Sequence, residues 1–441
     1  MLKFLIAGTL VASIGMFACS NCCLSQPPKD SERPGLANIE FSVELYKKRC
    51  GADGNVALSP VGISGSLALA LLGARAETQT QMIDVLRVHT EASGLSELFL
   101  AFRNGMEGLT HEGIQTNFAN SLWTLKGYEI ESSFIDSVKT VFNEPVSPLD
   151  FRNQPSESAD TINDWVNRKT DGKIQSIITP EQISPQMKMI MLSAVFFRGN
   201  WVHRFEEGLT TTEPFYAKPD LTLRMKAMKN SGKFKYARND LCQALELPCE
   251  GNRLSMVALI PNDISGINKP DETISADMFA GLRNQMTPTE VTLVFPGFVM
   301  NYSTNLSEIL ATMGMTDAFD AGKADFSGIS KTNNGNLFIS NAFQKVSVEV
   351  SEEGTSAAAA SSVTISDSAG AVQSSTTLVK ADRPFVFLIM DNKTGAVLFI
   401  GRLCDPTMKE ALGPRETKLP RGFRILYDKR LSGKPSDEYH N

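Results

Sequence analysis

The sequence predicts a mixed α/β fold, because segments with helical and with strand character alternate along it. Residues 63–74 are apolar almost all round, which is the pattern of a buried helix. Residues 346–350 carry Val at every second position, which is the pattern of a strand. Two apolar runs, 384–390 and 396–403, flank the turn residues 391–395 and predict a closing hairpin.

The composition suits one large globular unit without evident catalytic chemistry. The chain has 441 residues, of which 42% are hydrophobic and 21% charged. Its net charge of −6 implies no general affinity for nucleic acid or for an anionic membrane. No metalloprotease, phosphate-loop or dinucleotide motif is present, and residues 62–66 lack the final Gly of a nucleophile elbow. We therefore expect no enzymatic activity, no metal and no cofactor.

The amino-terminal residues predict export. Residues 1–18 contain Lys3 followed by an apolar run too short to span a bilayer, as in a secretory signal peptide. Residues 16–19 resemble a bacterial lipoprotein cleavage box, and residues 19–35 form a polar tether. A diacylated Cys19 would anchor the protein to a membrane, whereas simple cleavage would release it to the extracellular space. Both outcomes remain open.

Further helices and strands follow in an irregular order. Thr78 is expected to cap a helix, and Ile162, Trp165 and Val166 mark the inner side of another. The other helices are expected at 36–46, 96–109, 156–173 and 306–315. The other strands are expected at 55–60, 117–126, 187–201 and 290–300, with successive antiparallel strands over 222–260.

A stretch of small residues between the strand at 346–350 and the closing hairpin has two interpretations. As a linker it would be flexible and exposed. Alternate residues from Thr355 to Ile365, however, are small and then apolar, whereas the intervening residues are small and polar. That alternation is typical of a half-buried strand. The stretch therefore fits a loop that can also pair as a strand.

The residues at the start of this stretch resemble a known family. Glu352, Glu353, Gly354 and Thr355, followed by Ala357, Ala358, Ala359 and Ala360, resemble the hinge of the reactive-centre loop in an inhibitory serpin. Residues 383–387 and 399–402 resemble the serpin carboxyl-terminal signature. The resemblance covers residues 36–406. It implies one domain with three β-sheets, about eight or nine helices and an exposed reactive-centre loop at about 352–380. Residues 407–441 have no counterpart and are expected to form a largely disordered tail.

The resemblance implies suicide inhibition of a serine or cysteine protease. The protease nucleophile would cleave the loop and form an acyl-enzyme. The hinge would then insert as a new central strand and distort the bound protease. Residues 355–366 contain no charge and no Pro, either of which would oppose insertion. This favours an inhibitor over a non-inhibitory serpin with a chaperone, carrier or storage role. A surface-anchored adhesin is a third interpretation, for which partner binding should not depend on an intact loop.

Five further residues are implicated by the same resemblance. Trp201 resembles the Trp in the breach, where insertion begins, and Ser59 matches the polar shutter beneath the opening strands. In that cluster Ser193 stands where Asn is usual, Gln344 where His is common, and Gly62 where Ser is common.

Two counts place the reactive bond differently. Counting forward from Gly354 by the usual hinge length puts the cut at Ser368–Ala369. Counting back from Pro384 puts it near Gln373–Ser374. The loop is therefore longer than usual, and both bonds remain candidates.

The loop composition indicates the class of target. No Lys or Arg lies between Gly354 and Val379, so trypsin-like proteases are not expected. Asp367 leaves an Asp-directed protease open. The small and β-branched residues that suit elastase-like or subtilisin-like pockets are Val363, Ile365, Ala369, Ala371 and Val372.

Beyond the protease, few partners are expected. The helix at 96–109 corresponds to the heparin-binding helix of some serpins, but Arg103 is its one basic residue. We expect no heparin site, no nucleic-acid partner, and a monomer.

Overall fold

The computed structural model describes residues 39–49, 54–88, 94–142, 146–263, 274–331, 336–352 and 376–412. The predicted signal peptide, the tether with Cys19 and tail residues 413–441 lie outside the described residues. Within the described ranges, no helix combines the length and apolar character required to cross a membrane.

Eight α-helices occur in the described residues. The helices are α1 (Ile39–Arg49), α2 (Pro60–Leu71), α3 (Ala76–Leu86), α4 (Leu95–Met106), α5 (Ser132–Phe142), α6 (Pro155–Lys169), α8 (Ala276–Gln285) and α9 (Ser307–Thr312). As predicted, α2 is buried along its whole length. The prediction that Thr78 caps a helix is wrong, because Thr78 lies inside α3. Its hydroxyl instead accepts a hydrogen bond from the backbone N–H of Asp325 at 3.0 Å.

In the described residues, fourteen strands form one continuous hydrogen-bonded sheet. Eleven of them follow the order β1-β13-β12-β8-β7-β6-β9-β10-β4-β2-β3, and the other three pair beside this path, β5 with β6 and both β11 and β14 with β9. The first seven strands are β1 (Val56–Leu58), β2 (Ile114–Leu125), β3 (Ser147–Leu149), β4 (Met189–Gly199), β5 (Thr211–Lys218), β6 (Leu221–Arg238) and β7 (Cys242–Pro248). The other seven are β8 (Leu254–Pro261), β9 (Thr287–Asn305), β10 (Ile339–Val350), β11 (Thr377–Lys380), β12 (Phe385–Asp391), β13 (Val397–Leu403) and β14 (Glu410–Leu412).

Two long strands join three sheet-like regions of this path. β6 has 18 residues and β9 has 19, so each reaches from one region into the next. The main sheet has the order β9-β10-β4-β2-β3. A second region runs from β1 through β13, β12, β8 and β7 to β6, and a third contains β5, β11 and the first parts of β6 and β9. The three predicted sheets are therefore parts of one continuous structure.

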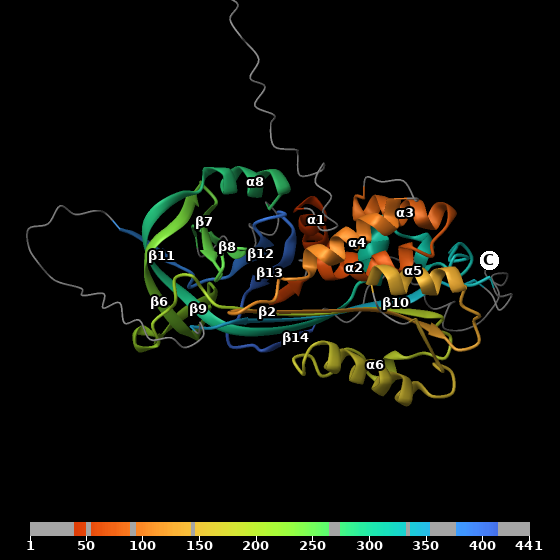
Figure 1. The fold of residues 1–441 in the computed structure, drawn as a ribbon. Helices are drawn as coiled ribbons and strands as arrows, with labels where there is room; N and C mark the ends of the chain where they lie inside the picture. Colours follow the sequence, from red (N-terminus) through yellow and green to blue (C-terminus); the bar gives the residue numbers. More distant parts are fainter. Residues whose placement is uncertain are drawn as a thin grey trace, which may run out of the picture.

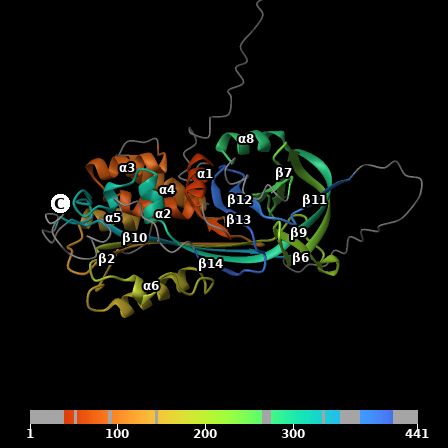
Figure 2. The same cartoon turned by 180° about the vertical axis from the view of Figure 1, so that it is seen from behind.

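Helices cover both faces of the main sheet (Figures 1 and 2). Helices α1 to α5 lie on one side and α6 crosses the other. Ile162, Trp165 and Val166 of α6 are buried as predicted. The Trp165 ring meets the Trp123 ring of β2 edge-on, with centroids 5.9 Å apart. This contact packs α6 against β2 of the main sheet.

Two short strands correct the predicted boundaries of the loop and the tail. Residues 377–380, predicted to belong to the loop, form β11 and pair in parallel with β9. Residues 410–412, predicted to belong to the disordered tail, form β14 and also pair in parallel with β9. Segments of three or four residues show no clear strand period, but a sheet edge offers hydrogen bonds to any backbone and so orders these short segments.

Candidate functional site

The predicted loop joins the end of β10 to the start of β11. The structure describes Ser351 and Glu352 and resumes at Thr376. The predicted residues outside the described ranges are Glu353, Gly354, Thr355, Ala357, Ala358, Ala359, Ala360, Asp367, Ser368, Ala369, Val372, Gln373 and Ser374. The described residues therefore include the sheet that would receive the loop and the first two residues of the loop region, Ser351 and Glu352.

The central pair of the main sheet is parallel. Strands β10 and β4 keep a continuous register from Asn341 opposite Ile190 to Glu349 opposite Arg198. On either side, β9 is antiparallel to β10, and β2 is antiparallel to β4. At the loop end of this parallel seam, Arg198 and Glu349 form a partly exposed ion pair at 3.8 Å, a type that contributes little to stability. The seam between β10 and β4 is thus the one place in the middle of this sheet where neighbouring strands run in the same direction.

Trp201 lies where the chain leaves β10. Its indole Nε1 donates a hydrogen bond to the carbonyl oxygen of Ser351 at 3.0 Å. The side chain is buried, and its ring meets Phe205 edge-on with centroids 6.4 Å apart. Backbone pairing with Cys249 fixes the position of Trp201 after β4 ends. The predicted breach residue therefore holds the base of the loop directly.

Glu352, the first predicted hinge residue, is anchored in a buried site. Its carboxylate accepts hydrogen bonds from the Thr210 hydroxyl at 2.8 Å and from Lys226 Nζ at 2.7 Å. Only 4% of Glu352 is exposed. Burial acts to raise the pKa of Glu352, but the hydrogen bonds from Lys226, its own backbone N–H and Thr210 outweigh burial, so its pKa lies below the ordinary value. The loop therefore starts from a charged residue whose carboxylate already has hydrogen-bond partners in this structure.

A row of polar side chains crosses the seam beneath α2. Gln344 of β10 lies opposite Ser193 of β4 and donates a hydrogen bond to its hydroxyl at 3.3 Å. Gln344 also exchanges two hydrogen bonds of 3.0 Å with the backbone of Ser59, the N-cap of α2. The Ser59 hydroxyl donates to the carbonyl oxygen of Leu398 at 2.7 Å. The structure thus brings the three predicted shutter residues together and ties them to β13.

Gly62 explains how α2 approaches this row so closely. A Cβ atom at Gly62 would lie 2.6 Å from both the Ser193 hydroxyl oxygen and a methyl carbon of Val195. Gly65, one turn on, has a similar relation to Asn120, whose side-chain nitrogen would lie 2.4 Å from an added Cβ. Gly62, where Ser is more usual, has no side chain, and Ser193 and Val195 of β4 occupy the space that a side chain would need.

Three residues of this region had no distinctive sequence signal. Asn120 lies opposite Ser193 on β2 and extends the polar row across a third strand. Thr210 and Lys226 hold Glu352, yet each is far from it in sequence. An Asn inside the strand predicted at 117–126 is the one feature that could have marked Asn120. Lys226 is one of several basic residues along β6, so nothing singled it out.

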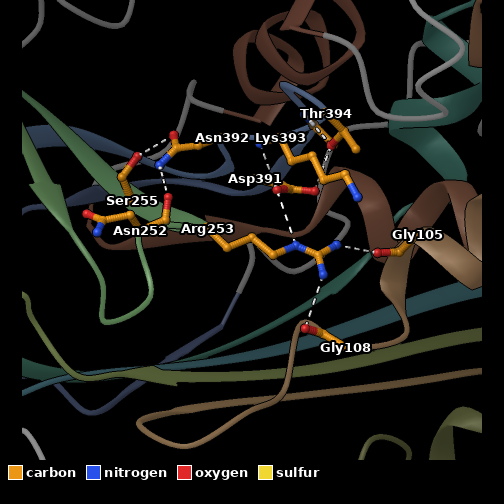
Figure 3. A network of polar contacts seen from close by, with 10 residues as sticks. Gly105, Gly108, Asn252, Arg253, Ser255, Asp391, Asn392, Lys393 and Thr394 are labelled. Atoms are coloured by element: carbon orange, nitrogen blue, oxygen red, sulfur yellow. Dashed lines mark hydrogen bonds and ion pairs between the residues drawn. The ribbon is translucent and has the colours of Figure 1, made fainter.

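A second polar network fixes the closing hairpin rather than the loop (Figure 3). Asp391, at the end of β12, is fully buried and forms an ion pair with Arg253 Nε at 3.5 Å. The two terminal nitrogens of Arg253 donate to the carbonyl oxygens of Gly105 and Gly108, at 2.7 and 3.1 Å. Arg253 therefore joins the hairpin to the end of α4. Over the described ranges, no three His, Cys, Asp or Glu side chains gather as they would around a metal ion.

Comparison with known proteins identifies relatives along most of the chain. The family model for serpins (serine protease inhibitors) matches residues 36–406. An uncharacterized serpin-like protein of Thermococcus kodakarensis is 35% identical over 380 residues, which cover 85% of this chain and 86% of the relative. The leukocyte elastase inhibitor of Equus caballus is 31% identical over 390 residues, which cover 85% of this chain and 100% of the relative.

Solved structures give the same answer for the fold. Uncleaved ovalbumin matches with a TM-score of 0.77 and 27% identity, over 85% of this chain and 100% of that one. Tengpin, a thermophilic serpin in its native state, matches with a TM-score of 0.74 and 28% identity, over 83% of this chain and 92% of that one. The chain therefore belongs to the serpin family.

Proposed function

We propose that this serpin inhibits a serine protease as a suicide substrate, by inserting its cleaved loop between β10 and β4. The observation that carries the proposal is the parallel pairing of these two strands. A chain that leaves the end of β10 and folds back between them runs antiparallel to both. Insertion would therefore replace one parallel ladder with two antiparallel ladders, which are slightly more stable per residue and add a strand's hydrogen bonds. This difference would drive the conformational change.

The side-chain contacts of the polar row add little to the cost of opening the backbone ladder between β10 and β4. Within the polar row, the described side-chain hydrogen bond that joins β10 to β4 runs from Gln344 to Ser193 and is 3.3 Å long. The two shorter bonds from Gln344 go to Ser59 and can persist while β4 moves away. A net hydrogen bond is worth about 1 kcal/mol. The row can therefore hold the closed sheet without blocking an incoming strand.

The loop sequence supports insertion from its hinge. Glu353 and Gly354 follow the anchored Glu352, and Thr355, Ala357 and Ala359 would face inward. Their small side chains require little separation of the strands. Ala358 and Ala360 would face outward, where small residues also add no bulk. An unpaired charge at an inward position would cost several kcal/mol, and residues 355–366 contain none.

The target we propose is an elastase-like or subtilisin-like serine protease, cut at Ser368–Ala369 or near Gln373–Ser374. The absence of Lys and Arg between Gly354 and Val379 supports this target class. A relative that is 31% identical bears the name leukocyte elastase inhibitor, which also supports it.

The test is incubation with a panel of serine and cysteine proteases, followed by denaturing gels and mass spectrometry. A complex that survives denaturant establishes inhibition, and the mass of the released carboxyl-terminal fragment gives the cleaved bond. Complexes with trypsin-like enzymes alone would overturn the proposed target class.

A second measurement separates inhibitors from serpins with a carrier, chaperone or storage role. The loop is nicked between Ser366 and Ser374, and thermal unfolding is compared with that of the intact protein. Insertion should raise the melting temperature strongly, because the sheet gains a strand. An unchanged melting temperature would instead favour a non-inhibitory role.

We also propose that the protein is exported and that Cys19 carries a lipid anchor. The support is the Lys3-initiated apolar run and the Ala18–Cys19 junction. Labelling with a fatty-acid probe should tag the wild type and leave Cys19→Ser unlabelled. Equal labelling of both would remove the anchor and leave simple secretion.

A further inference from the structure

The short strand β14 lies outside the part of the chain that matches the serpin family, which ends at residue 406. It pairs with β9 in parallel, with Glu410 opposite Asn301 and Leu412 opposite Ser303. The other side of β9 is already occupied there, because residues 298–305 pair with β10. Both ribbon views show β14 running beside the main sheet (Figures 1 and 2). β14 therefore occupies the outer edge of the main sheet.

A turn held by the buried side chain of Asn55 directs the chain onto this edge. Asn55, which is 4% exposed, accepts hydrogen bonds from the backbone N–H groups of Cys404 and Asp405, at 2.7 and 2.9 Å. Its amide nitrogen donates to the carbonyl oxygen of Asp405 at 2.7 Å. The Asp405 carboxylate then accepts from the backbone and the hydroxyl of Thr407. The reversal after β13 is thus fixed by specific bonds.

Asn301 holds the strand once it arrives. Its backbone N–H donates to the carbonyl oxygen of Lys409 at 2.7 Å. Its side-chain amide donates to the Glu410 carboxylate, also at 2.7 Å. Backbone and side-chain bonds from one residue of β9 therefore hold two consecutive residues of the carboxyl-terminal extension.

We infer that β14 is an edge cap, which keeps the outer edge of β9 from pairing with a second copy of this chain. An uncovered edge strand presents unpaired N–H and C=O groups and is a template for pairing with another chain. Without β14, residues 301–303 would lose their pairing on this side, and the segment 298–305 would be an edge of this kind along its whole length. Two identical edges related by a two-fold axis would run antiparallel and could join two main sheets into one. The expected partner of the uncovered edge is therefore the same segment of another molecule.

The register supplies a matched pair of full-length variants. Lys409 turns its carbonyl group to β9. The backbone N–H and C=O groups of Ala411, two residues further on, point in the same direction, toward β9. Those of Leu412 point away from β9. Ala411→Pro removes a donor that faces β9, whereas Leu412→Pro removes one that faces outward, where Pro is tolerated in an edge strand. Glu410→Ala removes the side-chain bond alone.

The experiment measures mass by light scattering after size exclusion over a range of concentrations, together with hydrogen exchange of residues 298–305. Circular dichroism checks that each variant is folded. The wild type and Leu412→Pro should remain monomeric. Ala411→Pro should form a dimer whose fraction rises with concentration, and in its monomer the Asn301 amide should exchange at least about ten-fold faster than in the wild type. Glu410→Ala should show a smaller change of the same kind.

The dimer itself gives a further check. If the uncovered edges pair with each other, the amides of residues 298–305 should regain protection in the Ala411→Pro dimer. A monomeric Ala411→Pro at every concentration would overturn the edge cap. So would equal association of Ala411→Pro and Leu412→Pro, because association would then not follow from the donor that faces β9. None of these outcomes depends on whether the protein inhibits a protease.

Discussion

The seam between β10 and β4 and the closing hairpin of β12 and β13 are both central in their sheets, but different interactions hold them. The seam is parallel, and a polar row with Gln344 and Ser193 crosses it. The hairpin is antiparallel, every residue of both strands is buried, and β12 is also antiparallel to β8. Its end is fixed by the ion pair of the buried Asp391 with the partly exposed Arg253. Under the proposed mechanism the seam exchanges one strand partner for another, so the apolar side chains of β10 and β4 are covered again by the inserted strand, whereas opening the hairpin would leave its apolar side chains exposed.

The largest effect should come from blocking the seam. Thr355 lies outside the described residues, and its expected inward direction rests on the alternation of residues along an inserted strand. Thr355→Arg would bring a guanidinium into the seam and bury an unpaired charge, at a cost of several kcal/mol. The variant should fold normally and be cleaved, but it should act as a substrate and form almost no covalent complex on denaturing gels.

Ser356→Arg is the control, because the next side chain along the strand points outward. It should form the complex far better than Thr355→Arg. Equal complex formation by the two variants would mean that strand insertion does not operate.

Damage to the hairpin should lower the free energy of unfolding. It should not change the difference in melting temperature between the cleaved and the intact protein. Asp391→Ala leaves Arg253 without its buried partner and removes the acceptor for Lys393 N–H and the Thr394 hydroxyl. We expect the free energy of unfolding in urea to fall by about 1.5–3 kcal/mol, because hydrogen bonds to a charged group are lost while Arg253 stays partly exposed. Breaking the exposed pair of Lys233 and Glu290 by Glu290→Ala should change it by less than about 1 kcal/mol. Similar losses for both variants would contradict a central role for Asp391.

Overpacking between α2 and the seam should have an intermediate effect. Gly62→Ala places a methyl group 2.6 Å from Ser193 and Val195, so α2 or β4 must shift. We expect a loss of about 1–3 kcal/mol in urea unfolding.

Gly281→Ala tests the same chemical change in open space. Among the described residues, no side chain or neighbouring segment lies within 4 Å of a Cβ at Gly281 in α8, so the substitution should be neutral or stabilise the helix by up to about 1 kcal/mol. The prediction fails if the two variants change stability in the same direction.

The sequence was sufficient where an element carries its own periodicity. The buried helix α2, the alternating end of β10 and the two apolar strands of the hairpin all lie where their patterns indicate. The family resemblance added Ser59, Ser193 and Gln344, which the structure places in one hydrogen-bonded row.

Contacts between distant segments could not be predicted in this way. Thr210 and Lys226 meet Glu352 because three separate strands or turns converge at the end of β10, and no local pattern encodes that meeting. The strand β14 was missed for a different reason. Its three residues are too few to show a strand period, and the edge of β9 rather than a pattern of its own makes it a strand.

The smallest effect concerns the anchor at the loop end of the seam and depends on pH. Glu352→Gln keeps the shape of the side chain but removes the charge that Lys226 and Thr210 satisfy, and it should lower the stability of the intact protein by about 1 kcal/mol at pH 7. The pKa of Glu352 is lowered in the folded protein, so its contribution is fully present above the unfolded pKa of about 4.3 and is lost as the pH falls through the folded value. The difference in urea unfolding between the two proteins should therefore be largest at pH 7 and should shrink as the pH falls below about 4.3. A difference that stays constant from pH 7 to pH 3 would show that the anchor does not depend on the carboxylate charge. Because the anchor sits beside the seam and not in the hairpin, the same substitution in the Asp391→Ala background should add its effect independently.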